Sequence, residues 1–218
     1  MKKLLFALLL VLVSFPVFAA DKDSAFDRVM KTQTIRCGYG TFPPWIYQDL
    51  QSGKMTGFSV GVAEALAAQL GFRLDWAEET GWGSLPESLY TGRVDVACSL
   101  LWIDPARSKQ VAYTRPLFFT PVHAYAREDD TRFTGKTEEI DDPVIRIAVQ
   151  EGDVSAALAN REFSKAQSIT SPQSVPSNQL LLDVTTGKAD VVFSDPLNVQ
   201  GFNDAQQKKL KKFPYQSL

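Results

Sequence analysis

One arginine in the sequence is placed where it could bind an anion. Arg107 follows Asp104-Pro105-Ala106 at the start of a predicted helix, where a cation opposes the helix dipole and therefore needs another partner. A planar guanidinium can hold both oxygens of a ligand carboxylate, whereas a lysine ammonium offers a single point charge. The alternative is an exposed salt bridge with Asp104 or with an acid from the second half of the chain.

Two aspartates directly follow predicted strands and could face the same ligand. Asp153 follows Gly152, and Asp195 stands between Ser194 and Pro196. Asp153 could equally cap the helix that comes after it. Asp195 could merely initiate a turn. Both alternatives stay open for each residue.

Aromatic side chains occupy the neighbouring loops. Phe42 and Trp45 follow the first predicted strand, Trp82 the second, and Trp102 the third, with Ser99 just before it. A single loop tryptophan is often a lid over a core. Three at one rim favour a platform for the apolar or planar parts of a ligand.

The remaining reactive side chains are too few for metal or nucleophilic chemistry. His123 is the one histidine, and it has no paired acid or nucleophile nearby in the sequence. One histidine and two cysteines do not make an ordinary zinc or iron–sulfur site. We therefore expect no catalytic residue, no metal and no cofactor.

The candidate residues need a sheet edge that brings them together. The pattern of the first half predicts alternating strands and helices, in an order that favours a parallel sheet with crossover helices. Ligands bind beyond the carboxyl ends of such strands. The predicted strands are residues 35–39, 72–76 and 94–100, and the predicted helices are residues 59–70, capped by Ser59 and Gly71, and 84–90.

The second half repeats this order. A strand is predicted at residues 145–149, a helix at 154–163, and another helix from Ser177 to the Thr186-Gly187 turn. The stretch 186–191 then closely resembles 91–96. Two restarts in the same order predict two α/β lobes, joined by an extended segment at residues 122–127, with a ligand cleft between them that a hinge can close.

Composition and charge exclude several classes of protein. The 218 residues are 44% hydrophobic and 22% charged, as in an ordinary globular protein, and a net charge of −2 offers no basic surface for nucleic acid. We expect Cys37 and Cys98 on neighbouring strands of the first lobe. Buried free cysteines are common and disulfide geometry is demanding, which favours two thiols, with a disulfide as the alternative.

The first residues are predicted to be a secretory signal peptide. Lys2 and Lys3 precede an apolar run over residues 4–13, and Val17-Phe18-Ala19 supplies a small-residue cleavage site after Ala19. The alternative is an uncleaved membrane anchor, although the run is shorter than the roughly 20 residues a span needs. We expect a mature periplasmic protein with lobe 1 at residues 20–125 and lobe 2 at 126–218.

Several segments, in their order along the chain, resemble one family. Residues 40–44, 56–60 and 89–101, followed by Arg107, Phe118, Gly152 and Asp195, are similar to the type-two periplasmic solute-binding proteins of the amino-acid ABC transporter group. The resemblance runs from about residue 35 to residue 195. It implies two Rossmann-like lobes with mixed, mostly parallel sheets, joined by a hinge.

The resemblance also implies roles for single residues. Arg107 would bind an α-carboxylate with help from Ser99, Asp195 would take an α-ammonium group, and the rings of Phe42 and Trp82 would cover the ligand side chain. The family pattern has a small hydroxyl residue at the position of Trp102 and a threonine at the position of Asp153. These departures favour a more cationic or more aromatic ligand than a plain amino acid.

The chain also departs from the family in length. The family's chain returns to lobe 1 after lobe 2 and ends there with a helix, but only 23 residues follow Asp195 in this sequence. We therefore expect lobe 2 to be followed by no return strand, and the chain to be shorter than its family at the C-terminal end.

The expected function is capture of a small solute without catalysis. The protein would bind a carboxylate-bearing solute, an amino acid or a related compound, as a monomer and deliver it to an ABC-transporter permease in the inner membrane. A second possibility on the same fold is a periplasmic dehydratase or lyase resembling cyclohexadienyl dehydratases, with Asp153 or Glu151 as the acid. A third is the sensory module of a larger assembly.

Overall fold

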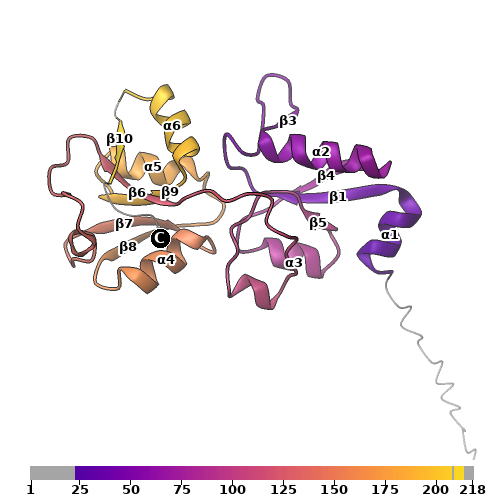
Figure 1. The fold of residues 1–218 in the computed structure, drawn as a ribbon, viewed down its shortest axis with the longest axis horizontal. Coiled ribbons are helices and arrows are strands. Elements are labelled where there is room, and N and C mark those ends of the chain that lie inside the picture. The colour runs from indigo at the N-terminus through magenta and orange to yellow at the C-terminus, as the bar shows by residue number, and fades with distance from the viewer. Residues whose placement is uncertain (1–22, 208, 214–218) are drawn as a thin grey trace, which may run out of the picture.

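The computed structural model describes residues 23–207 and 209–213. The predicted leader at residues 1–19 lies outside the described residues. Within them, no helix has the length and apolar character that crossing a membrane requires. Figure 1 shows two α/β bodies side by side, connected by one extended crossing of the chain. We call the body that holds residues 23–122 lobe 1, and the body that holds the described residues from 123 onward lobe 2.

Lobe 1 is built on a parallel three-stranded sheet in the order β4-β1-β5. Helix α2 contacts β4, and α3 contacts β1 and β5. A two-stranded antiparallel hairpin of β2 and β3 lies beside them. The elements are α1 (Ala25–Thr32), β1 (Thr34–Tyr39), β2 (Tyr47–Gln48), β3 (Met55–Thr56), α2 (Phe58–Leu70), β4 (Arg73–Glu79), α3 (Leu85–Tyr90), β5 (Val96–Ala97) and the short 3-10 helix η1 (Arg107–Lys109).

Helix α2 begins one residue earlier than predicted, and Ser59 is not its cap. The N-cap is Gly57, with a φ of 114° and no side-chain bond to the helix, while Ser59 is buried inside the first turn. A Cβ on Gly57 would lie 2.4 Å from the carbonyl oxygen of Trp45, so both the φ and the space require glycine. The predicted C-terminal cap is confirmed, because Gly71 takes the left-handed conformation there.

The third predicted strand is much shorter than expected. Only Val96 and Ala97 pair with β1 as a strand, in place of residues 94–100. The flanking backbone makes other bonds: Val94 N–H donates to the Ser88 carbonyl at the end of α3, and Cys98 N–H donates to the Gly38 carbonyl. The predicted strand is therefore confirmed only at its centre, where Val96 is exposed, and Val94 before it bonds to the end of α3.

The two cysteines form a disulfide. Cys37 lies in β1 and Cys98 directly follows β5, so the expectation of neighbouring strands is confirmed. The expectation of two free thiols is wrong. The Cα atoms lie 5.4 Å apart, which is within the range that a disulfide can bridge.

Lobe 2 is built on a five-stranded mixed sheet in the order β10-β6-β9-β7-β8. Strands β9, β7 and β8 run parallel, whereas β6 is antiparallel to both β9 and β10. The predicted boundary after residue 125 falls inside β6, the strand by which the chain enters lobe 2. The elements are β6 (His123–Arg127), η2 (Thr137–Glu139), β7 (Arg146–Gln150), α4 (Val154–Glu162), β8 (Gln167–Ser171), α5 (Asn178–Thr185), β9 (Val191–Ser194), α6 (Pro196–Ala205) and β10 (Leu210–Lys212).

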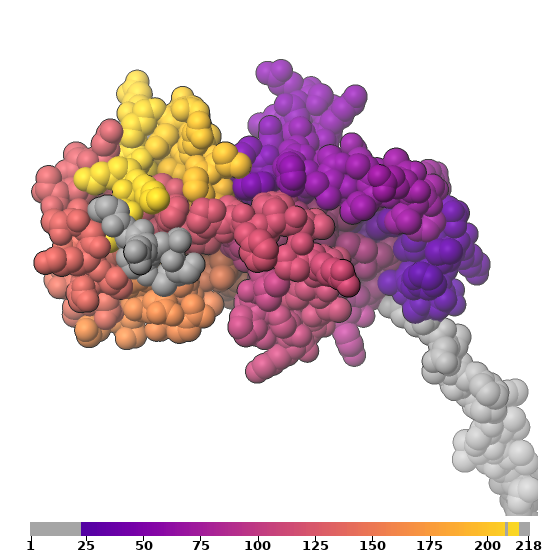
Figure 2. Space-filling view, viewed as in Figure 1, coloured from indigo at the N-terminus to yellow at the C-terminus, as the bar shows by residue number. Residues whose placement is uncertain are grey.

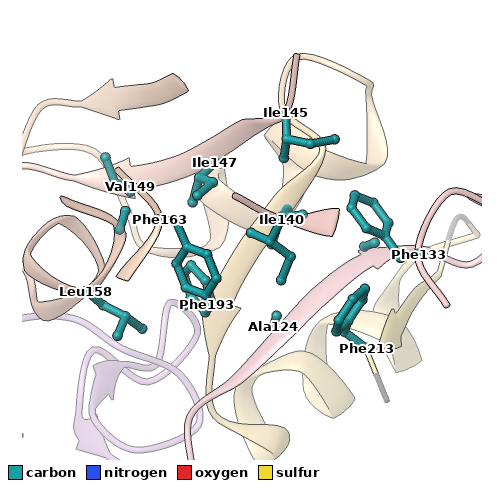
Figure 3. Close-up of a cluster of buried hydrophobic side chains, with 13 residues drawn as sticks. Ala124, Phe133, Ile140, Ile145, Ile147, Val149, Leu158, Phe163, Phe193 and Phe213 are labelled. Carbon is teal, nitrogen blue, oxygen red and sulfur yellow. The ribbon is translucent and has the colours of Figure 1, made fainter. Parts of the chain in front are cut away.

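The main hydrophobic core lies in lobe 2. Two buried clusters of thirteen and ten residues cover the two faces of its sheet, whereas lobe 1 has one cluster of three, formed by Tyr39, Ile46 and Val60. Figure 3 shows the largest cluster, in which the rings of Phe163 and Phe193 stack with centroids 5.2 Å apart.

The predicted repeat is visible as the same aspartate–arginine arrangement in both lobes. In lobe 1, the Asp95 carboxylate accepts from the backbone N–H and the guanidinium of Arg36. In lobe 2, Asp190 accepts from the same two groups of Arg146. Each aspartate follows a Thr-Gly turn and binds an arginine of the strand that its own strand pairs with, Arg36 of β1 or Arg146 of β7, so the sequence repeat at 91–96 and 186–191 is a structural repeat.

Candidate ligand-binding site

A cavity lies between the lobes, at the carboxyl ends of the strands. Its empty volume is about 630 Å³, counting the space at its mouth. Loops after β1, β4 and β5 line it from lobe 1, and the ends of β7 and β9 with the starts of α4, α5 and α6 line it from lobe 2. The lining residues are Phe42, Trp82, Leu100, Leu101, Trp102, Arg107, Gln150, Asp153, Val154, Ser177, Leu180, Leu181, Val192, Phe193, Ser194 and Asn198.

Five of the eight residues that the sequence singled out line this cavity. Phe42, Trp82, Trp102 and Arg107 do so from lobe 1, and Asp153 does so from lobe 2. The rule that candidate residues gather where strands end therefore located five of the sixteen lining residues.

Three aromatic rings form the lobe 1 side of the cavity. Phe42 contacts Trp82 edge to face, with centroids 6.3 Å apart, and contacts Trp102 in the same manner at 6.2 Å. Trp82 is buried, and a Cβ on Gly40 would come within 2.9 Å of its ring. Glycine at position 40 thus leaves the space that Trp82 fills. That these rings stack on a ligand stays a prediction.

Arg107 is buried at the cavity and forms no ion pair within the described residues. Its side chain comes from the 3-10 helix η1, and its Nη2 donates to the Gly152 carbonyl of lobe 2 over 3.1 Å. No ion pair of Arg107 occurs among residues 23–207 and 209–213. The alternative of a salt bridge with Asp104 is therefore not formed. Asp104 instead accepts from the backbone N–H of Ala106.

Asp153 has the capping role that the sequence left open, and its contact with a ligand stays a prediction. Its Oδ1 accepts from the backbone N–H of Ser155 over 2.8 Å and so caps α4. The residue also lines the cavity, on the wall that lobe 2 provides. A carboxylate held by a helix N-terminus in this way keeps one oxygen available to a ligand.

The other three predicted residues lie outside the cavity lining. The Ser99 hydroxyl exchanges hydrogen bonds with the backbone N–H and carbonyl of Gly40, which ties two lobe 1 loops together. Trp45 stacks on Phe118 within lobe 1. Asp195 is fully buried and caps α6 through the backbone N–H groups of Leu197 and Asn198. Their ligand roles stay predictions, and each has a structural role in this arrangement.

Sequence reasoning missed several polar residues of the wall. Gln150 and Ser194 are the last residues of β7 and β9, so the strand-end rule could have found both. Asn198 lies in the first turn of α6, and Ser177 directly precedes α5, where no sequence signal marks them as cavity residues. The described part of the chain contains no group of three or more metal-ligating side chains of the His, Cys, Asp or Glu type.

The lobes touch beside the cavity through backbone atoms. A Cβ on Gly152, whose φ is 74°, would lie 2.5 Å from the Cα of Gly83 in the other lobe. Gly81 is equally close to the side chain of Gln173, with 2.5 Å from a Cβ to its Oε1. Because these residues have no Cβ, the backbone of one lobe can come into contact with the other lobe at both points.

Comparison with known proteins agrees with this architecture. The sequence profile of the bacterial extracellular solute-binding proteins, family 3, matches residues 35–167. A probable amino-acid ABC transporter-binding protein of Haemophilus influenzae is 39% identical over 119 residues, which cover 53% of this chain and 45% of that protein. The cyclohexadienyl dehydratase of Pseudomonas aeruginosa is 28% identical over 183 residues, 82% of this chain and 65% of the enzyme.

The chain thus spans less than two thirds of these two curated relatives. An L-arginine-binding protein of Pseudomonas aeruginosa is 25% identical over 208 residues, which are 92% of this chain and 72% of that protein.

Solved structures share the fold. The ancestral amino-acid-binding protein AncCDT-1, a precursor of cyclohexadienyl dehydratase, superposes with a TM-score of 0.76 at 26% identity, over 87% of this chain and 82% of its own. Holo ArgBP from T. maritima superposes with a TM-score of 0.75 at 23% identity, over 88% and 81%. The two-lobed fold is that of type-two periplasmic binding proteins, and the chain belongs to the bacterial extracellular solute-binding proteins of family 3.

Proposed function

We propose that this protein binds a small carboxylate-bearing solute, an amino acid or a related compound, in the cavity between its lobes for uptake by an ABC transporter. The observation that carries the proposal is Arg107. Its side chain is buried at the cavity wall, with a neutral carbonyl as its partner and no ion pair to an acid of the described residues. Burial of a cation is costly unless an anion accompanies it, and a solute carboxylate would supply that anion.

The opposite wall suits a solute that also carries a positive group. Asp153 brings a carboxylate to the lobe 2 side, while Gln150 and Asn198 add amide groups. A molecule with an anionic end for Arg107 and a cationic part for Asp153 would satisfy both charges. The rings of Phe42 and Trp82 would contact its apolar portion.

The test is calorimetric titration with solutes found in a thermal-shift screen of amino acids, polyamines and dicarboxylates. Arg107→Ala should weaken binding by about 2–5 kcal/mol, because it leaves the solute anion buried without a partner. Arg107→Lys should recover part of that loss. Arg115, an exposed arginine of lobe 1, provides the control, and Arg115→Ala should leave affinity unchanged. Equal affinity of Arg107→Ala and the parent would reject the proposal.

A dehydratase activity on the same fold is the second candidate function. It is favoured by the carboxylate of Asp153 in the cavity and by the similarity to a cyclohexadienyl dehydratase. Glu151, the other acid considered, is exposed and does not line the cavity. Incubation with prephenate or arogenate separates the candidates. Catalytic release of product that Asp153→Asn abolishes would establish an enzyme, and stoichiometric binding without product would establish a carrier.

The location and partner follow from the same proposal. We expect the leader to be cleaved after Ala19, the mature monomer to reside in the periplasm, and the solute-bound form to dock on the permease in the inner membrane. Mass spectrometry of the exported protein checks the cleavage site. Transport assays with the permease reconstituted in vesicles check the partner.

A further inference from the structure

Trp45 is held firmly in lobe 1 but points toward lobe 2. Its ring stacks on Phe118 with centroids 5.4 Å apart and an interplanar angle of 17°, and it meets Phe58 edge to face at 5.9 Å. Both partners belong to lobe 1. The indole nitrogen is therefore presented to the other lobe on a fixed aromatic support.

The indole makes a hydrogen bond across the interface. Its Nε1 donates to Oδ1 of Asp195 over 3.1 Å, and Asp195 is fully buried at the N-terminus of α6 in lobe 2. Beside this bond, Nδ2 of Asn198 donates over 2.6 Å to the carbonyl of Pro43. Figure 2 shows the corresponding contact, where the yellow α6 meets the indigo part of lobe 1.

The Trp45–Asp195 bond lies outside the cavity lining, whereas Asn198 beside it also lines the cavity. Neither Trp45 nor Asp195 lines the cavity. Their bond can form only when the lobes are together, since it joins one lobe to the other. A bond that exists in one conformation and not in the other shifts the population toward the first, and a carboxylate acceptor makes it stronger than a neutral pair.

We propose that the Trp45–Asp195 bond is a latch that stabilises the closed arrangement of the lobes. Trp45 is then a positioning residue, which raises solute affinity by raising the fraction of molecules already closed. The effect on solute affinity rests on the proposed solute-binding function, whereas the bond itself forms without a solute. It also gives Asp195 a task other than direct contact with an α-ammonium group.

The test measures the separation of the lobes directly, in the protein without added solute. Cysteines introduced at Leu50 and Asp204 carry spin labels, because both residues are exposed and the native cysteines are joined in a disulfide. The two sites lie in the β2–β3 loop and near the end of α6, which project on the same side of the molecule in Figure 1. Pulsed electron paramagnetic resonance then reports the closed and open populations.

Trp45→Phe is the informative variant, because it keeps a ring for stacking on Phe118 and removes the indole N–H. Loss of a hydrogen bond to a charged group should lower the closed-to-open ratio about ten-fold. Asn198→Ala, which removes the adjacent bond from the other lobe, should shift the ratio in the same direction. Trp76→Phe is the matched control, since Trp76 contacts Tyr39 within lobe 1, and it should leave the distribution unchanged.

Two results would overturn the latch. One is that the parent and Trp45→Phe give the same distribution of distances between the spin labels. The other is that the parent shows no population at the distance expected for closed lobes. Circular dichroism and the melting temperature of each variant identify loss of fold. Because no solute is present, failure of the latch is distinguishable from failure of Arg107 to bind a carboxylate.

Discussion

The two lobes share a plan but differ in what stabilises them. Each has a Thr-Gly turn and a buried aspartate that binds an arginine of the neighbouring strand, β1 in lobe 1 and β7 in lobe 2. Lobe 2 adds two large apolar clusters, whereas lobe 1 has a cluster of three residues and a disulfide. Of the thirteen large apolar side chains that are exposed in the described residues, eleven belong to lobe 1.

This difference shows that one topology can be stabilised in two ways. Apolar burial contributes about 25 cal/mol for each Å² removed from water, so lobe 2 gains most of its stability from its core. Lobe 1 buries less and depends on a covalent link that restricts its unfolded chain. Perturbations of the core and of the disulfide should therefore act on different lobes.

The largest effect should come from the lobe 2 core. Phe163 is fully buried and stacks on Phe193, so Phe163→Ala should cost about 3–5 kcal/mol in the free energy of unfolding. Denaturant titration measures the loss, and hydrogen exchange locates it. Phe119→Ala is the control, because that ring is 91% exposed and its removal should change stability little. Equal costs for both variants would contradict the assignment of the core.

Removal of the disulfide should act on lobe 1. The double variant Cys37→Ser and Cys98→Ser opens a loop of 61 residues and should cost about 2–4 kcal/mol. Amide hydrogens of β1 and β4 should exchange faster, while those of β7 and β9 keep their protection. Faster exchange in both lobes to the same degree would show that the lobes unfold as one unit, and the comparison would fail.

The shared aspartates allow a matched pair of variants. Asp190 accepts from Arg146 and Arg132, and Asp190→Asn should cost lobe 2 about 1.5–3 kcal/mol, since it weakens hydrogen bonds to a charged group. Asp95→Asn, in the same position of lobe 1, should destabilise that lobe by a comparable amount. Lobe-resolved hydrogen exchange should show each effect in its own lobe.

The contribution of Asp190 to stability should also appear in the dependence of unfolding free energy on pH. Burial raises the pKa of Asp190, but hydrogen bonds from Arg146 and Arg132 outweigh burial and hold the pKa below its ordinary value of 3.8. Its contribution to stability is therefore complete above the ordinary pKa and is lost as the pH falls from about 4 toward the lower folded-state pKa. Asp190→Asn should flatten this part of the curve of unfolding free energy against pH.

The smallest effect on stability should come from the contact between the lobes. A Cβ on Gly83 would lie 3.1 Å from Oε1 of Gln173 and 3.3 Å from the Cα of Gly152. Gly83→Ala should leave each lobe stable to within about 0.5 kcal/mol, since surface changes of this kind act weakly, yet it should lengthen the closed separation between spin labels. Gly61→Ala meets no atom within 4 Å and should leave that separation unchanged.

The sequence predicted the lobes well because periodicity and turns are local. The helices at α2, α3, α4 and α5 and the strands β1, β4 and β7 were found to within a few residues. The predictions failed where the local structure depends on residues that are distant in the sequence. Gly57, and not Ser59, is the N-cap of α2, because the Trp45 carbonyl lies against that glycine. Cys37 and Cys98 form a disulfide because pairing of their strands brings them together.

Prediction of the site from local sequence patterns was limited in the same way. Strand ends located Phe42, Trp82, Trp102, Arg107 and Asp153 at the cavity. The same rule also selected Trp45, Ser99 and Asp195, which follow strands as well but are bonded to partners from elsewhere in the chain. Only the packed lobes determine which of two neighbouring loop residues faces a ligand.

On the proposed function, the backbone contact between Gly83 and Gly152 would also set a limit on the size of the solute. Main-chain atoms in contact cannot be compressed, so closure ends at the same separation whatever the cavity holds. A solute smaller than the enclosed space leaves gaps along the walls, and a larger one keeps the lobes apart. Discrimination by size would then rest on the two glycines, and discrimination by charge would rest on the side chains that line the cavity.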